Sequence, residues 1–293
     1  MSDHEGSYHV PKSSAIPIIS AIGLFFFGLG SIDIFDDPKH GIIYMSIGAV
    51  ILVLNMIVWF RTAMKESRDG LHDAQMQRTY QWGMIWYFVA QSAFALAFLG
   101  GMAYIRIFTV PWLGGHGPSE FQLTHLLIWP DFQGVWPVLV NPANHEFVGA
   151  KAALDPWTFP LICTITMLIS IISMVWARVS YSKQQKWGLV GGLAVTFVAA
   201  IFFAVVHVFG LLHAIYYYKL TLASGIYGSL FFMINITFCL NLLIGTIFLA
   251  VVLYRALLGR FSLANQFSVR AVSEVWYFVA ILWIVIFLYV YLF

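Results

Sequence analysis

The stretch from Trp187 to Gly210, WGLVGGLAVTFVAAIFFAVVHVFG, decides the fold class of this chain. It contains no Asp, Glu, Lys or Arg, and His207 is its only titratable side chain. A helix of about 20 mostly apolar residues is long enough to cross the hydrocarbon core of a bilayer. The stretch is therefore predicted to be a transmembrane helix.

The rest of the chain repeats this pattern. Apolar residues make up 61% of the 293 positions and charged residues only 10%, whereas a soluble domain carries roughly a quarter of its residues as charges. We therefore expect an all-α integral membrane protein with seven transmembrane helices. Their predicted ranges are 16–35, 41–60, 80–108, 157–177, 187–210, 224–257 and 272–293.

The lengths of the connections predict how these helices are grouped. A tight charged turn, Asp36-Asp37-Pro38-Lys39-His40, joins the first two helices, so residues 16–60 are expected to form a two-helix hairpin. Residues 80–293 are expected to form a five-helix bundle with a long external loop at 109–156. With the tail at 1–15, the whole of 1–293 is predicted to be a single membrane domain.

The basic residues predict the orientation. Of the 15 Lys and Arg residues, four fall on one side of the predicted helices, and the remaining 15 − 4 = 11 fall on the other. Because basic residues accumulate on the cytoplasmic side, we expect a cytoplasmic N-terminus and a periplasmic C-terminus in a bacterial inner membrane. The net charge of +2 gives no support to a nucleic-acid partner. The four outside residues are Lys39, Arg106, Lys151 and Lys219.

Titratable groups inside the predicted helices are few. Asp33 and Glu274 lie near helix ends, where a solvated or lipid-facing anchor is the simple interpretation and a proton-carrying role the alternative. His207 and His213 are six residues apart in one helix, or about 600° of rotation, so they do not share a face. We interpret His207 as a hydrogen-bonded core histidine and His213 as an interfacial one. No second helix offers a ligand, so no heme, copper or other metal and no catalytic residue is expected in this chain.

Several short motifs run through nearly the whole chain in a familiar order. Together with seven spans, they make the chain resemble subunit III of proton-pumping cytochrome c oxidases, especially the proteobacterial members. The motifs are Tyr8-His9-Val10-Pro11, Lys65-Glu66-Ser67, Gln81-Trp82-Gly83-Met84, Pro111-Trp112-Leu113-Gly114-Gly115, Val135-Trp136-Pro137, Asp155-Pro156-Trp157, Gly225-Ile226-Tyr227-Gly228, Ile244-Gly245-Thr246-Ile247-Phe248-Leu249 and Trp276-Tyr277-Phe278-Val279.

The departures from that family are systematic. The chain resembles a divergent member that lacks the family's buried Glu, His and Asp network. Losing these groups together avoids leaving any one of them buried without its partner. The positions concerned are Gln91, Phe209 and Gly210 for glutamates, Phe238 and Asn241 for the family's Phe-His-Gly-x-His histidines, Ala280 for an aspartate, Cys163 for an asparagine and Arg178 for a histidine.

The resemblance implies a non-catalytic accessory subunit of a heme-copper respiratory oxidase. Such a subunit stabilises catalytic subunit I, supports its proton uptake and sits in a complex with copper-binding subunit II. Heme and copper are then expected in the partner subunits, and this chain is expected to hold structural phospholipids. The residues that map onto the headgroup contacts are Arg61, Lys65, His72 and Arg255.

Two other functions remain as alternatives. The chain is alternatively a divergent subunit III-like paralogue in a nitric-oxide-reductase-like complex, or a supernumerary subunit beside a normal subunit III. A self-sufficient transporter would need inverted repeats, broken helices or charges at the midplane. The sequence shows none of these features.

Overall fold

The computed structural model describes residues 13–34, 37–68, 74–259 and 266–292. Throughout these residues the regular structure is helical, and seven helices are long and apolar enough to cross a membrane. The expected all-α membrane fold is thus confirmed. The chain divides into two compact units, Met1–Ile85 and Trp86–Phe293, with the boundary inside helix α3 (Ala74–Tyr104).

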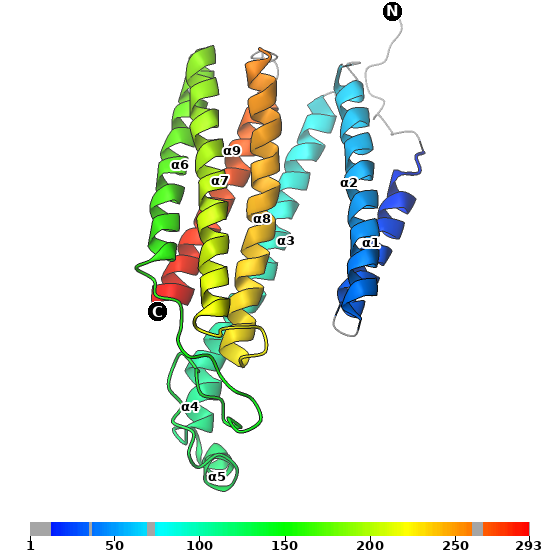
Figure 1. Ribbon diagram of the computed structural model, residues 1–293. Coiled ribbons are helices and arrows are strands. Elements are labelled where there is room, and N and C mark those ends of the chain that lie inside the picture. The colour runs from blue at the N-terminus through cyan, green and yellow to red at the C-terminus, as the bar shows by residue number, and fades with distance from the viewer. Residues whose placement is uncertain (1–12, 35–36, 69–73, 260–265, 293) are drawn as a thin grey trace, which may run out of the picture. The chain divides into compact units, whose positions relative to one another are not determined.

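The first unit contains an antiparallel hairpin of α1 (Ile16–Asp33) and α2 (Pro38–Arg68) (Figure 1). Asp37 caps α2, since its Oδ1 accepts hydrogen bonds from the backbone N–H groups of Lys39 and His40 at 3.1 and 3.4 Å. Pro38 follows as the first helical residue, a position where its missing N–H costs nothing. The hydrogen bond from His40 Nδ1 to Asp37 Oδ2, 2.7 Å long, is the main reason why the pKa of Asp37 is lowered.

Glycines set how closely the two hairpin helices approach. A Cβ atom added to Gly30 would collide with the backbone nitrogen of Met45, and one added to Gly48 with the backbone nitrogen of Phe27. Asn55 on α2 adds a polar tie, because its Nδ2 donates to the carbonyl oxygen of Ile16 at 2.9 Å. Small residues and interhelical hydrogen bonds are the usual means of joining helices in lipid.

The second unit is built on α6 (Phe159–Ser182), α7 (Lys186–Tyr216), α8 (Ile226–Leu257) and α9 (Gln266–Ile286) (Figure 1). Of the seven candidate spans, the one formed by α9 is the most enclosed, with half of its most apolar window buried. Indole N–H groups tie α9 to α6: Trp276 donates to Ser170 Oγ at 3.1 Å, and Trp283 to Thr164 Oγ1 at 3.0 Å. A seven-residue spacing places both indoles on one face of α9.

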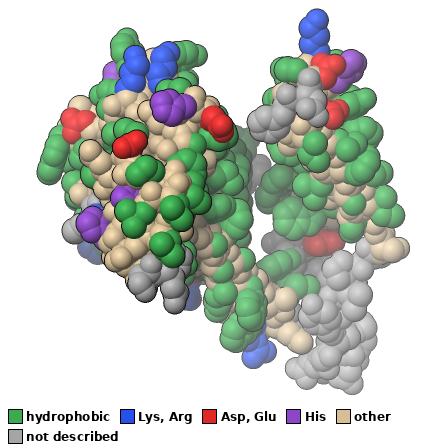
Figure 2. Space-filling model, turned by 90° about the horizontal axis from the view of Figure 1, so that it is seen from below, with side chains coloured by type: hydrophobic (Ala, Val, Ile, Leu, Met, Phe, Trp, Pro, Cys, Tyr) green, Lys and Arg blue, Asp and Glu red, His purple; other side chains and the backbone are tan. Residues whose placement is uncertain are grey.

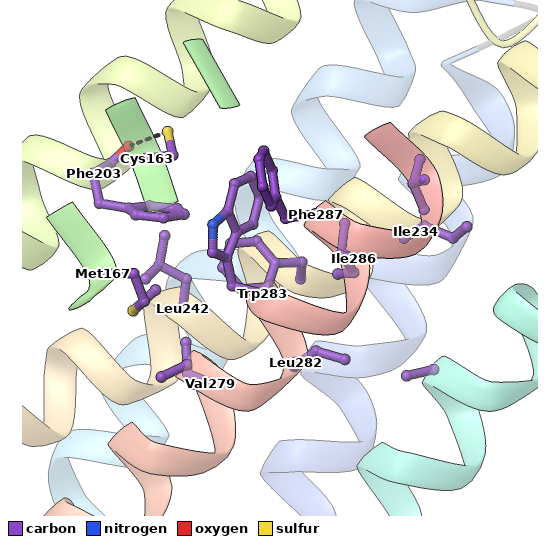
Figure 3. Packing of buried hydrophobic residues seen from close by; sticks show 14 of the residues in the cluster. Cys163, Met167, Phe203, Ile234, Leu242, Val279, Leu282, Trp283, Ile286 and Phe287 are labelled. Carbon is purple, nitrogen blue, oxygen red and sulfur yellow. Dashed lines mark hydrogen bonds between the residues drawn. The ribbon is translucent and has the colours of Figure 1, made fainter. Parts of the chain in front are cut away.

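Large apolar side chains fill the centre of this unit. Trp283 packs edge-on against Phe203 of α7, with ring centroids 4.8 Å apart, and tilted against Phe238 of α8, with centroids 5.0 Å apart. Figure 3 shows Trp283 and Phe203 with Met167, Leu242 and Val279 around them. The outward surface is also apolar, as lipid-facing helices require, for example at Ile172 and Val198, which are 70% and 66% exposed.

Several helix ends differ from the ranges expected from hydropathy. α2 continues to Arg68 rather than ending at 60, because residues 61–68 are mostly good helix formers that are too polar for a hydropathy-based range. The third span continues past 108 through a π-helical segment, η1 (Ile105–Thr109), into α4 (Val110–Leu113). Pro111 sits in the first turn of α4, where a proline is tolerated. The long connection therefore begins at Gly114 and runs to Thr158.

The connection packs on the bundle's own helices. The Trp136 ring meets the Tyr227 ring of α8 edge-on at 5.5 Å, and the backbone N–H of Lys151 donates to the carbonyl oxygen of Tyr218 at 2.8 Å. It contains one short helix among its described residues, α5 (Ser119–Leu127). Seen from this end, hydrophobic side chains cover the flanks, while charged and histidine side chains are scattered over the end surface (Figure 2).

Candidate functional site: a neutral polar seam in the bundle

Polar side chains of α3 and α8 meet within the second unit and form what we call the polar seam, which consists of Tyr87, Gln91 and Asn241. Asn241 Nδ2 donates to Gln91 Oε1 at 3.1 Å and to the carbonyl oxygen of Thr237 at 3.0 Å. Asn241 Oδ1 accepts from the Tyr87 hydroxyl at 3.2 Å. Tyr87 and Gln91 are four residues apart and so lie on one face of α3. The central amide, only 1% exposed, is satisfied on both of its ends.

A second polar pair lies between α8 and the C-terminal segment η3 (Phe287–Leu292). The Tyr291 hydroxyl donates to Asn235 Oδ1 at 2.9 Å, and Asn235 Nδ2 donates to the carbonyl oxygen of Phe231 at 2.8 Å. Asn235 has no exposed surface. In lipid, each such interhelical hydrogen bond contributes on the order of 1 kcal/mol. The polar seam therefore joins α3 to α8, and the second polar pair joins η3 to α8.

The chemistry available to the seam follows from its groups. An amide side chain does not titrate, and a phenol without assistance has a pKa near 10. None of the three seam residues is a carboxylate or a histidine, so the seam itself has no group that exchanges protons near neutral pH. It can position helices but cannot relay protons by its own titration.

His207 differs from expectation. Its Nε2 atom is fully buried and has no hydrogen-bond partner among the described residues, so the expected hydrogen bond at that atom is absent. The reason is the surrounding packing: the rings of Phe203, Phe238 and Trp283 enclose the imidazole at centroid distances of 5.7, 5.7 and 5.2 Å. His213, near the end of α7, stacks on the Tyr217 ring at 4.4 Å.

Of the two carboxylates singled out from the sequence, Asp33 ends α1, whereas Glu274 lies about two turns into α9. Glu274 Oε1 accepts from Arg270 Nε at 2.7 Å, an i,i+4 pair on α9 that is partly exposed to solvent. Exposed pairs of this kind stabilise a protein by at most about 1 kcal/mol. Asp33 is the last residue of α1 and is half-buried. Across the described residues, no three or more His, Cys, Asp or Glu side chains gather in a metal-binding arrangement.

The residues expected to hold phospholipid headgroups lie in different parts of the chain. Arg61 and Lys65 are exposed and four residues apart, hence on one face of α2 in the first unit. Arg255 is half-buried near the end of α8 in the second unit, where its Nη1 atom donates to Ser268 Oγ at 3.1 Å. His72 lies outside the described residues.

The sequence identified part of the polar seam and part of the second polar pair. Gln91, Asn235 and Asn241 stand out as polar residues within apolar runs. The tyrosines that complete the contacts, Tyr87 of the seam and Tyr291 of the pair, do not stand out. The available signal for Tyr87 was its i,i+4 spacing from Gln91. For Tyr291 no local signal exists, because its partner is 56 residues away in the sequence.

The fold and the seam together define a multi-pass membrane protein whose bundle is held by neutral polar contacts. The sequence model of the family "Cytochrome c oxidase subunit III" matches residues 6–116 and 119–293. Cytochrome c oxidase subunit 3 of Formosania lacustris and that of Cyprinus carpio are each 27% identical to this chain, and that of Danio rerio is 26% identical. Each comparison covers 99% of this chain and 98% of the relative.

The chain belongs to the cytochrome c oxidase subunit III family. Members of this family are a non-catalytic subunit of a respiratory-chain oxidase and carry no redox centre of their own. A bundle whose polar seam consists of amides and a phenol agrees with such a role.

Proposed function

We propose that this chain is the accessory subunit of a cytochrome c-oxidising, O2-reducing heme-copper oxidase in a bacterial inner membrane. It sits beside catalytic subunit I, in a complex that also includes copper-binding subunit II. Subunits I and II together hold the heme and copper. The observation that carries the proposal is the family match over nearly the whole chain. The distribution of basic residues supports a cytoplasmic N-terminus and a periplasmic C-terminus.

In this proposal the chain stabilises subunit I and supports its proton uptake without relaying protons through the seam. The seam is neutral, so its contribution is to keep α3 and α8 in register. Support for proton uptake then comes from the surface that the subunit covers and from its bound lipids.

A second assignment keeps the scaffold but changes the assembly. The chain would then be a subunit III-like paralogue in a nitric-oxide-reductase-like complex, or a supernumerary subunit beside a normal subunit III. The observation in its favour is that Gln91 and Asn241 bond to each other as neutral amides, at positions where the family resemblance implies a glutamate and a histidine. Such a replacement is compatible with a changed partner.

The decisive experiment is purification of the native assembly through an affinity tag on this chain. We expect mass spectrometry to find catalytic subunit I and copper-binding subunit II at equal stoichiometry with this chain. Recovery with a nitric-oxide-reductase-like catalytic subunit, or together with a second subunit III, would support the second assignment and contradict the first.

We also propose that Arg61, Lys65, His72 and Arg255 hold anionic headgroups of structural phospholipids. Each basic residue near an anionic lipid surface changes the lipid's affinity about fivefold. The variant Arg61→Gln/Lys65→Gln should therefore retain less phosphatidylglycerol in native mass spectrometry of the purified assembly. Arg178→Gln, which removes an exposed charge from α6, is the matched control and should retain the wild-type amount. Equal retention by both variants would contradict the assignment.

A further inference from the structure

The second unit has an open pocket at the end that carries the 114–158 connection. Its volume is about 420 Å³, within the range of roughly 300–1,000 Å³ that is usual for ligand pockets. Leu113 ends α4, Trp129 follows α5, Asn141 and Phe147 lie further along the connection, and Gly225 caps α8. The described residues that line the pocket are all uncharged. The pocket therefore suits a neutral, largely apolar group.

Asn141 places an amide in the wall of this pocket. Its Nδ2 donates to the carbonyl oxygens of Phe147 at 2.9 Å and of Ser224 at 3.3 Å, which uses both amide hydrogens and fixes the side chain. Asn141 is only 8% exposed, yet its Oδ1 accepts no hydrogen bond from the described residues. A buried amide oxygen is stabilised by an N–H or O–H donor. The pocket therefore lacks one donor.

Gly225 keeps this oxygen accessible. A Cβ atom added to Gly225 would collide with Asn141 Oδ1, so a larger residue would cover or displace the acceptor. The backbone of Gly225 also has φ of 109°, a conformation that favours glycine. Asn141 Oδ1 is not among the fully enclosed polar atoms of the described chain that lack a partner. It is therefore a fixed acceptor that a ligand in the pocket can reach.

Helix α5 carries an exposed apolar face beside the pocket. Leu123, Leu126 and Leu127 are 59%, 66% and 79% exposed, and their spacing of three and four residues puts them on one face of the helix. His125 Nδ1 donates to the carbonyl oxygen of Leu113 at 3.0 Å, which holds α5 against the pocket wall. The pocket and this face of α5 therefore adjoin each other.

This surface lies outside the membrane-spanning part of the chain. The candidate spans end at Leu113 and begin again at Phe159, and α5 lies beyond the ends of α7 and α8 (Figure 1). A small molecule would fill the pocket but leave the leucines of α5 uncovered. Contiguous apolar surface outside the lipid marks contact with another protein. Trp and Tyr side chains are the ones that most often anchor such contacts in pockets.

We propose that the pocket and the exposed face of α5 form a docking surface for the extramembrane part of another protein, which inserts a Trp or Tyr side chain into the pocket. The indole N–H or phenol O–H donates to Asn141 Oδ1, and the ring packs against Trp129 and Phe147. The leucines of α5 cover the apolar surface around this anchor. The proposal holds for either assembly considered above, because it depends on the chemistry of the anchor and not on the identity of the catalytic subunit.

The test places a photoreactive residue in the pocket wall. Phe147→p-benzoylphenylalanine replaces an aromatic side chain that is 60% exposed. Membranes are irradiated, the native assembly is purified through a tag on this chain, and cross-linked peptides are identified by mass spectrometry. We expect a cross-link to an extramembrane peptide that contains Trp or Tyr, from a protein that also copurifies without irradiation. Ala223→Trp, which adds a ring at an exposed position of the pocket wall, should lower the yield by at least about fivefold. Leu222→Trp, at the neighbouring exposed position outside the wall, should leave it unchanged.

A second measurement tests the hydrogen bond to Asn141 Oδ1 on the purified full chain. The probes are 5-fluoroindole and 1-methyl-5-fluoroindole, which lacks the N–H donor, and their binding is followed by fluorine NMR. We expect 5-fluoroindole to bind about fivefold more tightly than its methylated analogue, and Ala223→Trp to abolish this difference. Cross-links only to lipid or to a second copy of this chain, or to peptides without Trp or Tyr, would overturn the proposal. So would an undiminished yield in Ala223→Trp. If Ala223→Trp does not fold, the two probes on the wild-type chain decide, and equal affinities would overturn the proposal.

Discussion

The amide of Gln91 shows how a single residue determines the chemistry of the bundle. Its Oε1 accepts a hydrogen bond from Asn241 Nδ2 at 3.1 Å, and Asn241 in turn accepts one from Tyr87. The contact needs an acceptor on α3 and a donor on α8, and a neutral amide pair provides both without burying a charge. Burying an unpaired charge costs free energy. Replacing one amide of this pair by a charged side chain is therefore expected to lower the stability of the protein.

We expect Gln91→Glu to destabilise the protein by about 1–3 kcal/mol, because the carboxylate has no cationic partner in the seam. The measurement is the thermal unfolding midpoint of the purified protein. Gln75→Glu makes the same substitution at an exposed position of α3, outside the span, and should leave the midpoint nearly unchanged. A Gln91→Glu variant as stable as wild type would contradict our account of the seam.

At the scale of elements, small residues have different effects in different helices. In α7 a Cβ on Gly192 would press on the backbone of Ala177 at 2.7 Å, so the glycine permits the close packing of α6 and α7. In α3, by contrast, a Cβ on Gly100 or Gly101 would meet nothing within 4 Å in the described chain. A stripe of small residues predicts packing only where a partner helix faces it.

The α1–α2 hairpin offers a direct test of this distinction. Gly30→Ala places a methyl group against the backbone of Met45 and should destabilise the hairpin by about 1–3 kcal/mol. Gly28→Ala, two residues away, meets nothing within 4 Å and should be neutral or stabilising, since alanine is the better helix former. Titration of the purified protein with sodium dodecyl sulfate, followed by circular dichroism, measures both variants. If the two substitutions have equal effects, close approach at Gly30 does not hold the hairpin.

At the scale of the whole molecule, the arrangement of charges predicts the orientation in the membrane. Eleven of the 15 basic residues (15 − 4) fall on the side opposite the 114–158 connection, so this connection is expected to be periplasmic. An impermeant maleimide should label Gln133→Cys in intact cells. It should label Ser182→Cys, at the last residue of α6 and next to the turn that leads to α7, only after the inner membrane is permeabilised. The reverse pattern would show that the orientation is inverted.

The sequence by itself determined the number and type of the membrane helices. Hydropathy is a local property: a run such as 187–210 must form a helix in lipid whatever its neighbours are, because its backbone groups have no other partners there. The order of short motifs also indicated the family, which the match over residues 6–116 and 119–293 confirmed. Helix ends in water were less predictable, as the extension of α2 to Arg68 shows, since helix propensity there outweighs hydropathy.

Only the tertiary structure decided which polar groups meet. Asn241 joins Gln91 from 150 residues away, and Tyr291 reaches Asn235 across 56 residues. The same holds for the aromatic enclosure of His207, whose Nε2 finds no hydrogen-bond partner in the described part of the chain. These contacts depend on how each helix is rotated about its axis and crosses its neighbours, and that follows from the packing of all the side chains together rather than from any local stretch.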